Sequence, residues 1–199
     1  MTAFSLTWDY RCPFARNMHE HVVTALEAGA AWDVGFVPFS LSQAHLEEGD
    51  PPVWDDPATD SGLTALQLGV AVRDHDPDHF LAAHRALFSA RHDHGLDLRD
   101  RDKLTTIVGE LGVETKAVLA AVDDGSALAT VRAEHEAAVA EHEVWGVPTF
   151  LQGDQAVFVR VMNRPEEDAD VARLTIDRVL GLLADGPNLN EYKHTTLPR

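Results

Sequence analysis

The sequence predicts an α/β fold that carries a large all-helical insertion, and three observations lead to this prediction. The chain opens with a strand–helix–strand pattern, continues with a block of purely helical periodicity, and closes with a helix, two short strands and a final helix. We therefore expect residues 1–40 and 126–199 to form one α/β domain and residues 41–125 to form an inserted helical subdomain. A chain of 199 residues can bury such a core without disulfide bonds.

The opening unit is a β-α-β motif. Residues 4–8 are rich in strand-forming residues and predict a buried strand. Pro13 then begins a helical pattern that Gly29 ends, because proline fits the first turn of a helix and glycine fits the residue after its last turn. Apolar and polar residues alternate over residues 32–36, which predicts a second strand that ends at Pro38.

The middle of the chain has a different character. Residues 46–60 are rich in proline and acidic residues, which predicts a loop. Four helical stripes of apolar residues follow, at residues 63–70, 80–88, 104–111 and 118–122. No strand-like alternation interrupts these stripes, so we expect this block to be entirely helical.

The closing unit begins with a helix that we expect Ser126 to cap and Glu143 to end. Residues 149–152 and 156–161 predict two strands joined by a hairpin turn at Gly153-Asp154, and residues 170–183 predict an amphipathic helix before a polar, extended tail. The residues expected to face the core from the two helices are Leu128, Val131, Ala138, Val139, Val171, Leu174, Val179, Leu180 and Leu183.

The composition excludes several classes of protein. Asp and Glu outnumber Lys and Arg by 33 to 16, which gives a net charge of −17. This charge repels the phosphate backbone of nucleic acids, and the sequence contains no cluster of basic residues that could bind it. No apolar run is long enough to span a membrane, and residues 1–10 lack the features of a signal peptide. Because Cys12 is the only cysteine, no intramolecular disulfide can form, and we expect a cytoplasmic protein.

Cys12 is the candidate nucleophile, because it lies where the first strand ends and the first helix begins, directly before Pro13. Unpaired backbone N–H groups and the positive end of the helix dipole stabilise a thiolate at this position. We therefore expect the pKa of Cys12 to lie below that of a free cysteine, about 8.5, and the thiolate to be the reactive form. The alternative is a buried structural cysteine.

A second motif, Gly146-Val147-Pro148-Thr149-Phe150, places a proline at the first position of a strand, where its missing N–H disrupts no ladder. Together with Cys12-Pro13-Phe14-Ala15 at a helix start, this motif resembles the DsbA family of thioredoxin-fold oxidoreductases over nearly the whole chain. The stretch from Ala156 to Pro165 is similar to cytosolic actinobacterial members, some of them described as mycothiol-dependent reductases. The resemblance implies a bacterial protein with a thioredoxin-like fold and Cys12 as the attacking cysteine. It also implies a cis peptide bond between Val147 and Pro148, which lies against Cys12.

Ala15 departs from the family pattern, which usually has a second cysteine at this position. Without that thiol, Cys12 cannot release a mixed disulfide by itself, and dithiol oxidase activity is excluded. Monothiol exchange with a small thiol is the main hypothesis. Two alternatives stay open: a glutathione-dependent transferase or isomerase related to the kappa-class transferases and the 2-hydroxychromene-2-carboxylate isomerases, which carry serine in place of Cys12, and a redox-inactive binding module.

The resemblance implies Cys12 and Pro148 as the catalytic residues. The residues expected to bind the substrate are Pro13, Phe14, Val147, Trp8 and Trp145. We expect no metal and no tightly bound cofactor, with a low-molecular-weight thiol (mycothiol or glutathione) as co-substrate and a small molecule or a disulfide as substrate. Binding of nucleic acid or membrane is not expected, and a homodimer is possible.

The eleven histidines show no zinc-binding spacing. His75 and His79 are four residues apart, but Pro77 between them predicts that they lie on different helices. We expect the histidines outside the apolar stripes to be solvated, including His19 and His21 after Cys12 and His135 and His142 before Pro148.

Overall fold

The computed structural model describes residues 2–186 and 188–196 of the chain. Its elements, in chain order, are β1 (Thr2–Trp8), α1 (Pro13–Glu27), β2 (Trp32–Pro38), α2 (Leu41–Ala44), a 3-10 turn (Val53–Asp55), α3 (Leu63–His75), α4 (Pro77–His92), α5 (Arg101–Glu110), α6 (Thr115–Asp123), α7 (Ser126–His142), β3 (Thr149–Gln152), β4 (Gln155–Phe158) and α8 (Ala169–Asp185). The predicted order of strands and helices is therefore present, and the short helix α2 is the one that the sequence pattern missed.

A four-stranded mixed sheet with the order β2-β1-β3-β4 forms the centre of the molecule. β1 pairs in parallel with β2 along its whole length, and β3 and β4 form the antiparallel hairpin that continues the sheet from the other side of β1. The fold is thus the thioredoxin-like α/β arrangement that the resemblance implies.

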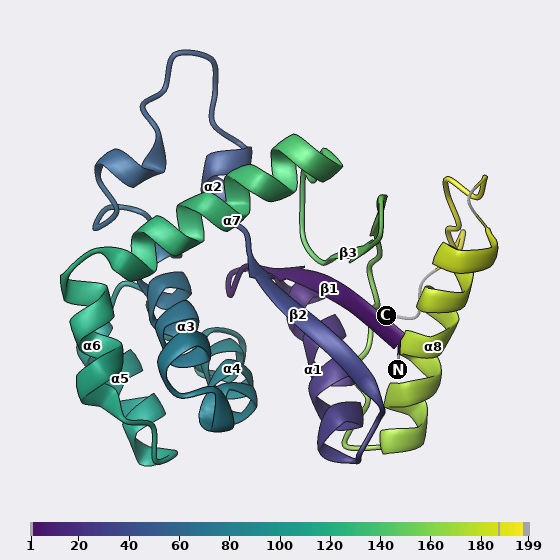
Figure 1. Ribbon diagram of the computed structural model, residues 1–199, viewed down its shortest axis with the longest axis horizontal. Helices are drawn as coiled ribbons and strands as arrows, with labels where there is room; N and C mark the ends of the chain where they lie inside the picture. The colour runs from purple at the N-terminus through teal and green to yellow at the C-terminus, as the bar shows by residue number, and fades with distance from the viewer. Residues whose placement is uncertain (1, 187, 197–199) are drawn as a thin grey trace.

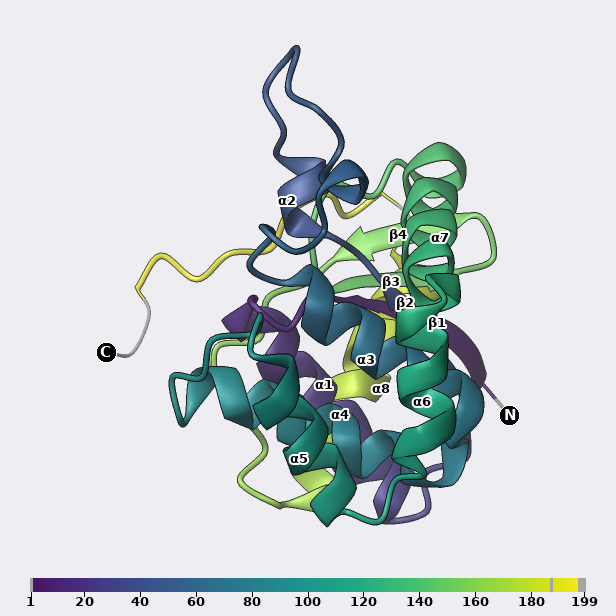
Figure 2. The same ribbon diagram turned by 90° about the vertical axis from the view of Figure 1, so that its left-hand side faces the viewer.

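The helices occupy distinct places around this sheet (Figure 1). Helix α1 packs against β1 and α8, and α7 packs against β2 and α3. Helices α3 to α6 gather on the side of the sheet that is bounded by β2, opposite α8, and the view turned by 90° shows that they form one bundle (Figure 2). The whole segment between α2 and α7 is helical or loop, as its periodicity predicts.

Several details differ from the sequence-based expectations. Val139 on α7 and Val171 and Leu174 on α8 are exposed, because their helices cover the core with a narrower face than the apolar pattern suggests. Gly125, with a positive φ of 82°, occupies the N-cap position of α7, so Ser126 is its first residue. The last strand ends at Phe158 instead of residue 161, and residues 187 and 197–199 of the expected tail lie outside the described residues.

Tyr10 joins the sheet to the helical insertion. Its fully buried ring packs against Phe88 of α4, and its hydroxyl lies beside Gly69 of α3. A β-carbon at Gly69 would overlap the phenol, with its Cε2 only 2.9 Å away. The end of β1 can therefore approach α3 only because residue 69 has no side chain.

We expect Gly69→Ala to destabilise the protein by about 1–3 kcal/mol, since overlap with a buried ring outweighs the gain in helix propensity. Gly181→Ala in α8 is the matched control, because a β-carbon there meets nothing within 4 Å and should stabilise the helix by up to about 1 kcal/mol. Urea unfolding of the two variants measures both effects. A Gly69→Ala variant as stable as Gly181→Ala would contradict the proposed packing.

Candidate functional site

Cys12 lies at the N-cap position of α1, with Pro13 as the first helical residue. The backbone N–H of Ala15 donates to Sγ of Cys12 over 3.4 Å, and the thiol itself donates to the carbonyl oxygen of Val147, also over 3.4 Å. The two motifs, 135 residues apart in the chain, are therefore in direct contact. Only 8% of Cys12 is exposed, so little of the residue is open to a reactant.

Asp9 holds the turn between β1 and α1 in place. Its carbonyl accepts a hydrogen bond from the N–H of Cys12 (3.0 Å), and its fully buried carboxylate accepts from the guanidinium of Arg11 (2.7 Å) and the N–H of Leu41 (2.9 Å). A buried carboxylate needs such partners, because an unpaired charge in the interior is strongly unfavourable. The turn that presents Cys12 is thus fixed to the start of α2.

Thr149 anchors the loop that faces Cys12. Its N–H donates to Oγ1 of Thr7 on β1 (2.9 Å), and its own hydroxyl donates to the carbonyl of Gly146 (2.8 Å). The Val147–Pro148 peptide bond is cis, the conformation that the resemblance implies, and both residues are buried. The backbone of Val147 is thereby held next to the sulfur.

Burial raises the pKa of the Cys12 thiol, and this overturns the expectation of a lowered value. The N–H groups of Ala15 and Phe14 lower the pKa, as the helix start predicts, and so does the positive charge of Arg160. Removal of the thiol from water and the negative charge of Asp9 act in the opposite direction, and burial is the larger effect. Cys12 is therefore a thiol that donates to Val147, and the thiolate is the minor form at neutral pH.

The alkylation rate of Cys12 with iodoacetamide is expected to titrate with an apparent pKa above the value of about 8.5 for a free cysteine. Arg160→Gln should raise this pKa further, because it removes a positive charge that favours the thiolate. Arg132→Gln, on the exposed surface of α7, should leave it unchanged. A titration below 8.5 in the natural protein would show that the helix start outweighs burial.

An aromatic and cationic row flanks the cysteine. The guanidinium of Arg160 lies 5.2 Å from the ring centroid of Phe14 and 5.8 Å from that of Phe158, and Phe158 in turn packs on Trp145 with 4.5 Å between ring centroids. Trp145 is 63% exposed, which is unusual for so large an apolar side chain. The sequence predicts Phe14 and Trp145 near the site but not Phe158 or Arg160, because β4 and the segment that follows it meet α1 only in the folded chain.

The other expected substrate-binding residues are distributed unevenly. Pro13 is exposed at the start of α1, and Val147 is buried with its carbonyl turned toward Cys12. Trp8 is fully buried, so its expected contact with a substrate is not possible in this structure. It packs instead against His84 and Tyr10 behind the site.

Four buried groups form a hydrogen-bonded chain behind the site. Tyr10 donates to Nδ1 of His84 (2.8 Å), Nε2 of His84 lies 2.9 Å from Nδ1 of His19, and Nε2 of His19 lies 3.1 Å from the carbonyl of Thr7. Because the carbonyl can only accept, a neutral His19 donates from Nε2, so Nε2 of His84 donates to His19 and the Tyr10 hydroxyl donates to His84. Burial lowers the pKa of His19 to about 4 and that of His84 well below its ordinary value.

The expectation that the histidines outside the apolar stripes are solvated is therefore wrong for His19, His21 and His135, all of which are buried. His75 ends α3 and His79 lies in α4, as Pro77 predicts. Within residues 2–186 and 188–196, no three His, Cys, Asp or Glu side chains are placed to share a metal ion. No helix in the same part of the chain has the length and apolar character of a membrane span.

Comparisons with known proteins agree on the fold of this chain. The family model of the DSBA-like thioredoxin domain matches residues 6–166. The cytosolic disulfide reductase DsbM from Pseudomonas aeruginosa, whose structure is also known with GSH, is 17% identical with a TM-score of 0.60 over 90% of this chain and 99% of DsbM. A 2-hydroxychromene-2-carboxylate isomerase is 15% identical with a TM-score of 0.62 over 92% of this chain and 98% of the isomerase.

Reduced DsbA1 from Neisseria meningitidis is 18% identical, with a TM-score of 0.58 over 89% of this chain and 83% of that protein. Among curated protein sequences, no significant relative was found. At these identities, the solved structures establish the shared fold, whereas the chemistry must be argued from the residues around Cys12.

Proposed function

The chain belongs to the family of DSBA-like thioredoxin domains, and from this premise we propose that it is a cytoplasmic thiol-disulfide oxidoreductase that works with a single cysteine. The contact between Cys12 Sγ and the Val147 carbonyl carries the proposal, because it places the only sulfur nucleophile of the chain against a buried peptide edge. Ala15 occupies the position of the family's second cysteine, so exchange ends at a mixed disulfide unless another molecule resolves it.

The reaction has three steps that together conserve atoms and electrons. In the first, the Cys12 thiolate attacks a disulfide R–S–S–R′, forming Cys12–S–S–R and releasing R′S⁻, which takes up a proton. In the second, the thiolate of a small thiol attacks the Cys12 sulfur of this mixed disulfide and releases RS⁻. In the third, attack by a further molecule of the small thiol restores the Cys12 thiolate and gives the oxidised, disulfide form of the small thiol.

Two features support a small anionic thiol such as glutathione or mycothiol as the co-substrate. The guanidinium of Arg160 lies over Phe14 and Phe158 beside the cysteine, and it offers a positive charge in a protein of net charge −17. The structure of DsbM with GSH shows that a protein of this fold can hold such a thiol.

Mass spectrometry of the protein isolated without reductant tests the proposal. We expect an adduct on Cys12 with the mass of a small thiol, which dithiothreitol removes. The purified protein should reduce a mixed disulfide of glutathione only when a small thiol is present, and Cys12→Ser should lose this activity. Absence of both the adduct and the turnover would overturn the proposal.

The thiol form of Cys12 favours a second candidate, in which Cys12 donates a hydrogen bond to a bound thiolate instead of reacting. A raised pKa and a donated hydrogen bond suit this role, which would be that of a transferase or isomerase. Cys12→Ser separates the two functions, because serine keeps the donor but removes the nucleophile. Thiol-dependent activity that survives in Cys12→Ser and is lost in Cys12→Ala would favour the second function.

A further inference from the structure

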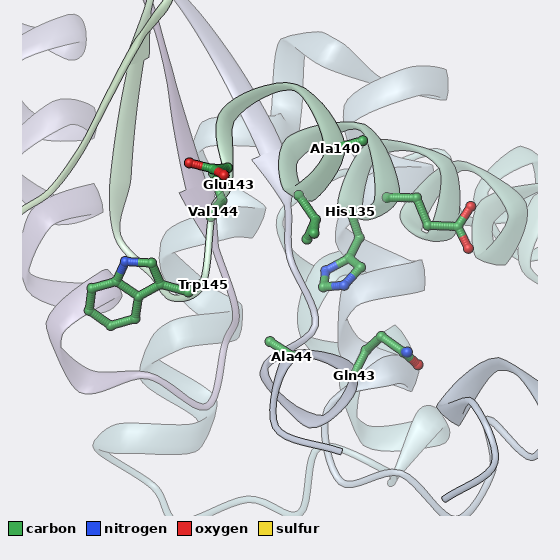
Figure 3. A pocket seen from close by; sticks show the side chains of 9 residues that line it. Gln43, Ala44, His135, Ala140, Glu143, Val144 and Trp145 are labelled. Atoms are coloured by element: carbon green, nitrogen blue, oxygen red, sulfur yellow. The ribbon is translucent and has the colours of Figure 1, made fainter. Parts of the chain in front are cut away.

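A cavity of about 660 Å³ lies between α2 and the end of α7, beside the loop that leads to Val147. Figure 3 shows the ring of His135 pointing from α7 toward Gln43 and Ala44 of α2, and Trp145, which also lines the cavity, lies farther along with its indole turned away from His135. Trp145 also packs on Phe158 in the row beside Cys12, so one side chain is shared between the cavity and the candidate site. None of the residues that line the cavity takes part in the exchange steps described above.

His135 offers an unused hydrogen-bond donor to this cavity. It is 97% buried, since only 3% of it is exposed, and its Nδ1 accepts from the N–H of Ser40 over 3.3 Å. The proton of the neutral ring is therefore on Nε2, which has no partner among the described residues. Among the described side chains, the nitrogens that have neither a hydrogen-bond partner nor contact with solvent belong to Trp8, His21 and His142. Nε2 of His135 is not one of them, so it is accessible from the cavity that His135 lines.

Gln43 adds donors of the same kind. Its side-chain oxygen accepts from the N–H of Val53 over 3.0 Å, which fixes the orientation of the amide. In the part of the chain that the structure describes, its NH₂ group has no partner. The surrounding walls are apolar, formed by Ala44, Val139, Ala140 and Val144. The charged lining residues are both carboxylates, Glu136 and Glu143, so an anionic ligand would be repelled.

We propose that this cavity binds an uncharged, largely apolar molecule through a carbonyl or amide oxygen that accepts from Nε2 of His135 and from Gln43. The cavity shares Trp145 with the row beside Cys12, so the molecule that it binds is the non-thiol part of the substrate that reacts at Cys12. This assignment to the substrate rests on the proposed function. The binding itself does not require a reactive cysteine. The two hydrogen-bond donors require an acceptor oxygen on the ligand, the apolar walls favour an apolar body, and the nearby carboxylates disfavour a negative charge.

Three probes of similar shape test the proposal: acetophenone, which carries a carbonyl, α-methylstyrene, which replaces it with a methylene, and benzoate, which is anionic. Binding is measured from the NMR shift of the Trp145 indole N–H, assigned with Trp145→Phe. Acetophenone is expected to bind about tenfold more tightly than α-methylstyrene, because the latter leaves a buried donor unpaired. Benzoate should not bind. Equal binding of the two uncharged probes, or tighter binding of benzoate, would overturn the proposal.

Variants locate the binding. Ala140→Phe should fill the cavity and abolish binding, whereas Ala137→Phe, at an exposed position of α7 that does not line the cavity, should leave it intact. His135→Phe should remove the preference for acetophenone, and if this variant does not fold, the Ala140 and Ala137 pair still decides. Binding that survives Ala140→Phe would overturn the location.

The same titration in Cys12→Ala separates this proposal from the proposed function. If acetophenone binds there while the natural protein shows no thiol exchange, the cavity proposal stands and the function fails. If exchange occurs but no probe perturbs Trp145, the cavity proposal alone fails.

Discussion

Replacing Ala15 with cysteine is expected to give the protein a dithiol activity that the natural chain lacks. Residue 15 lies one turn into α1, and its N–H already contacts Sγ of Cys12. A second thiol there would attack the mixed disulfide on Cys12 from within the molecule, forming an internal disulfide between residues 12 and 15 and releasing the reduced substrate. Because the internal thiol acts at a high effective concentration, we expect release at least about 100-fold faster than with millimolar external thiol.

A single-turnover experiment measures this effect. The reduced variant, freed from reductant, is mixed with a peptide that contains an intramolecular disulfide, and the reduced peptide is quantified by mass spectrometry after acid quenching. The natural protein should yield only a small amount of mixed disulfide. Ala15→Ser controls for packing, since Ala15 is fully buried and any larger residue there alters the core. An Ala15→Cys variant that forms the internal disulfide but never reduces the peptide would argue against redox exchange at this site.

Acidification from pH 6.5 to about 4 is expected to destabilise the fold strongly. Burial lowers the pKa of His19 and of His135 to about 4 and that of His84 well below its ordinary value of 6.5. The unfolded chain therefore takes up protons on these histidines as the pH falls through 6.5, while the folded chain does not until the pH reaches about 4. The contribution of these histidines to stability is fully present above pH 6.5 and is lost within this window, by up to about 1.4 kcal/mol per pH unit for each histidine.

Urea unfolding at several pH values measures this dependence. His84→Gln keeps a donor and an acceptor in the chain from Tyr10 to Thr7 but cannot be protonated. The slope of the unfolding free energy against pH should therefore fall by the contribution of about one proton taken up on unfolding. Ala137→Gln, at an exposed position of α7, introduces no titratable group and should leave the slope unchanged. The slope is the informative quantity, because His84→Gln also changes the packing and hence the absolute stability. If the stability of the natural protein does not change between pH 6.5 and 4, the conclusion that these histidines are buried in the neutral form is wrong.

Much of the architecture could be predicted because it depends on neighbours in the chain. The strand before Cys12, the helix that begins at Pro13 and the hairpin at Gly153-Asp154 follow from periodicity and from proline and glycine preferences over a few residues. The position of Cys12 at a helix start follows from the same local rules. Its contact with Val147 followed from the family resemblance alone, because no local rule joins residues 135 positions apart.

Tertiary structure decided how these residues behave. The same helix start that favours a thiolate is overruled by burial, which raises the pKa of Cys12 because β1, α1 and the Val147 loop close around the sulfur. His19 and His135 belong to helices of mixed polarity, and only the packing of other elements removes them from water. The row from Phe14 to Trp145 joins α1, the segment after β4 and the loop after α7, which are far apart in sequence. Helix starts and turns are set by interactions over about four residues, whereas burial, and with it charge and access, depends on segments brought together only by folding.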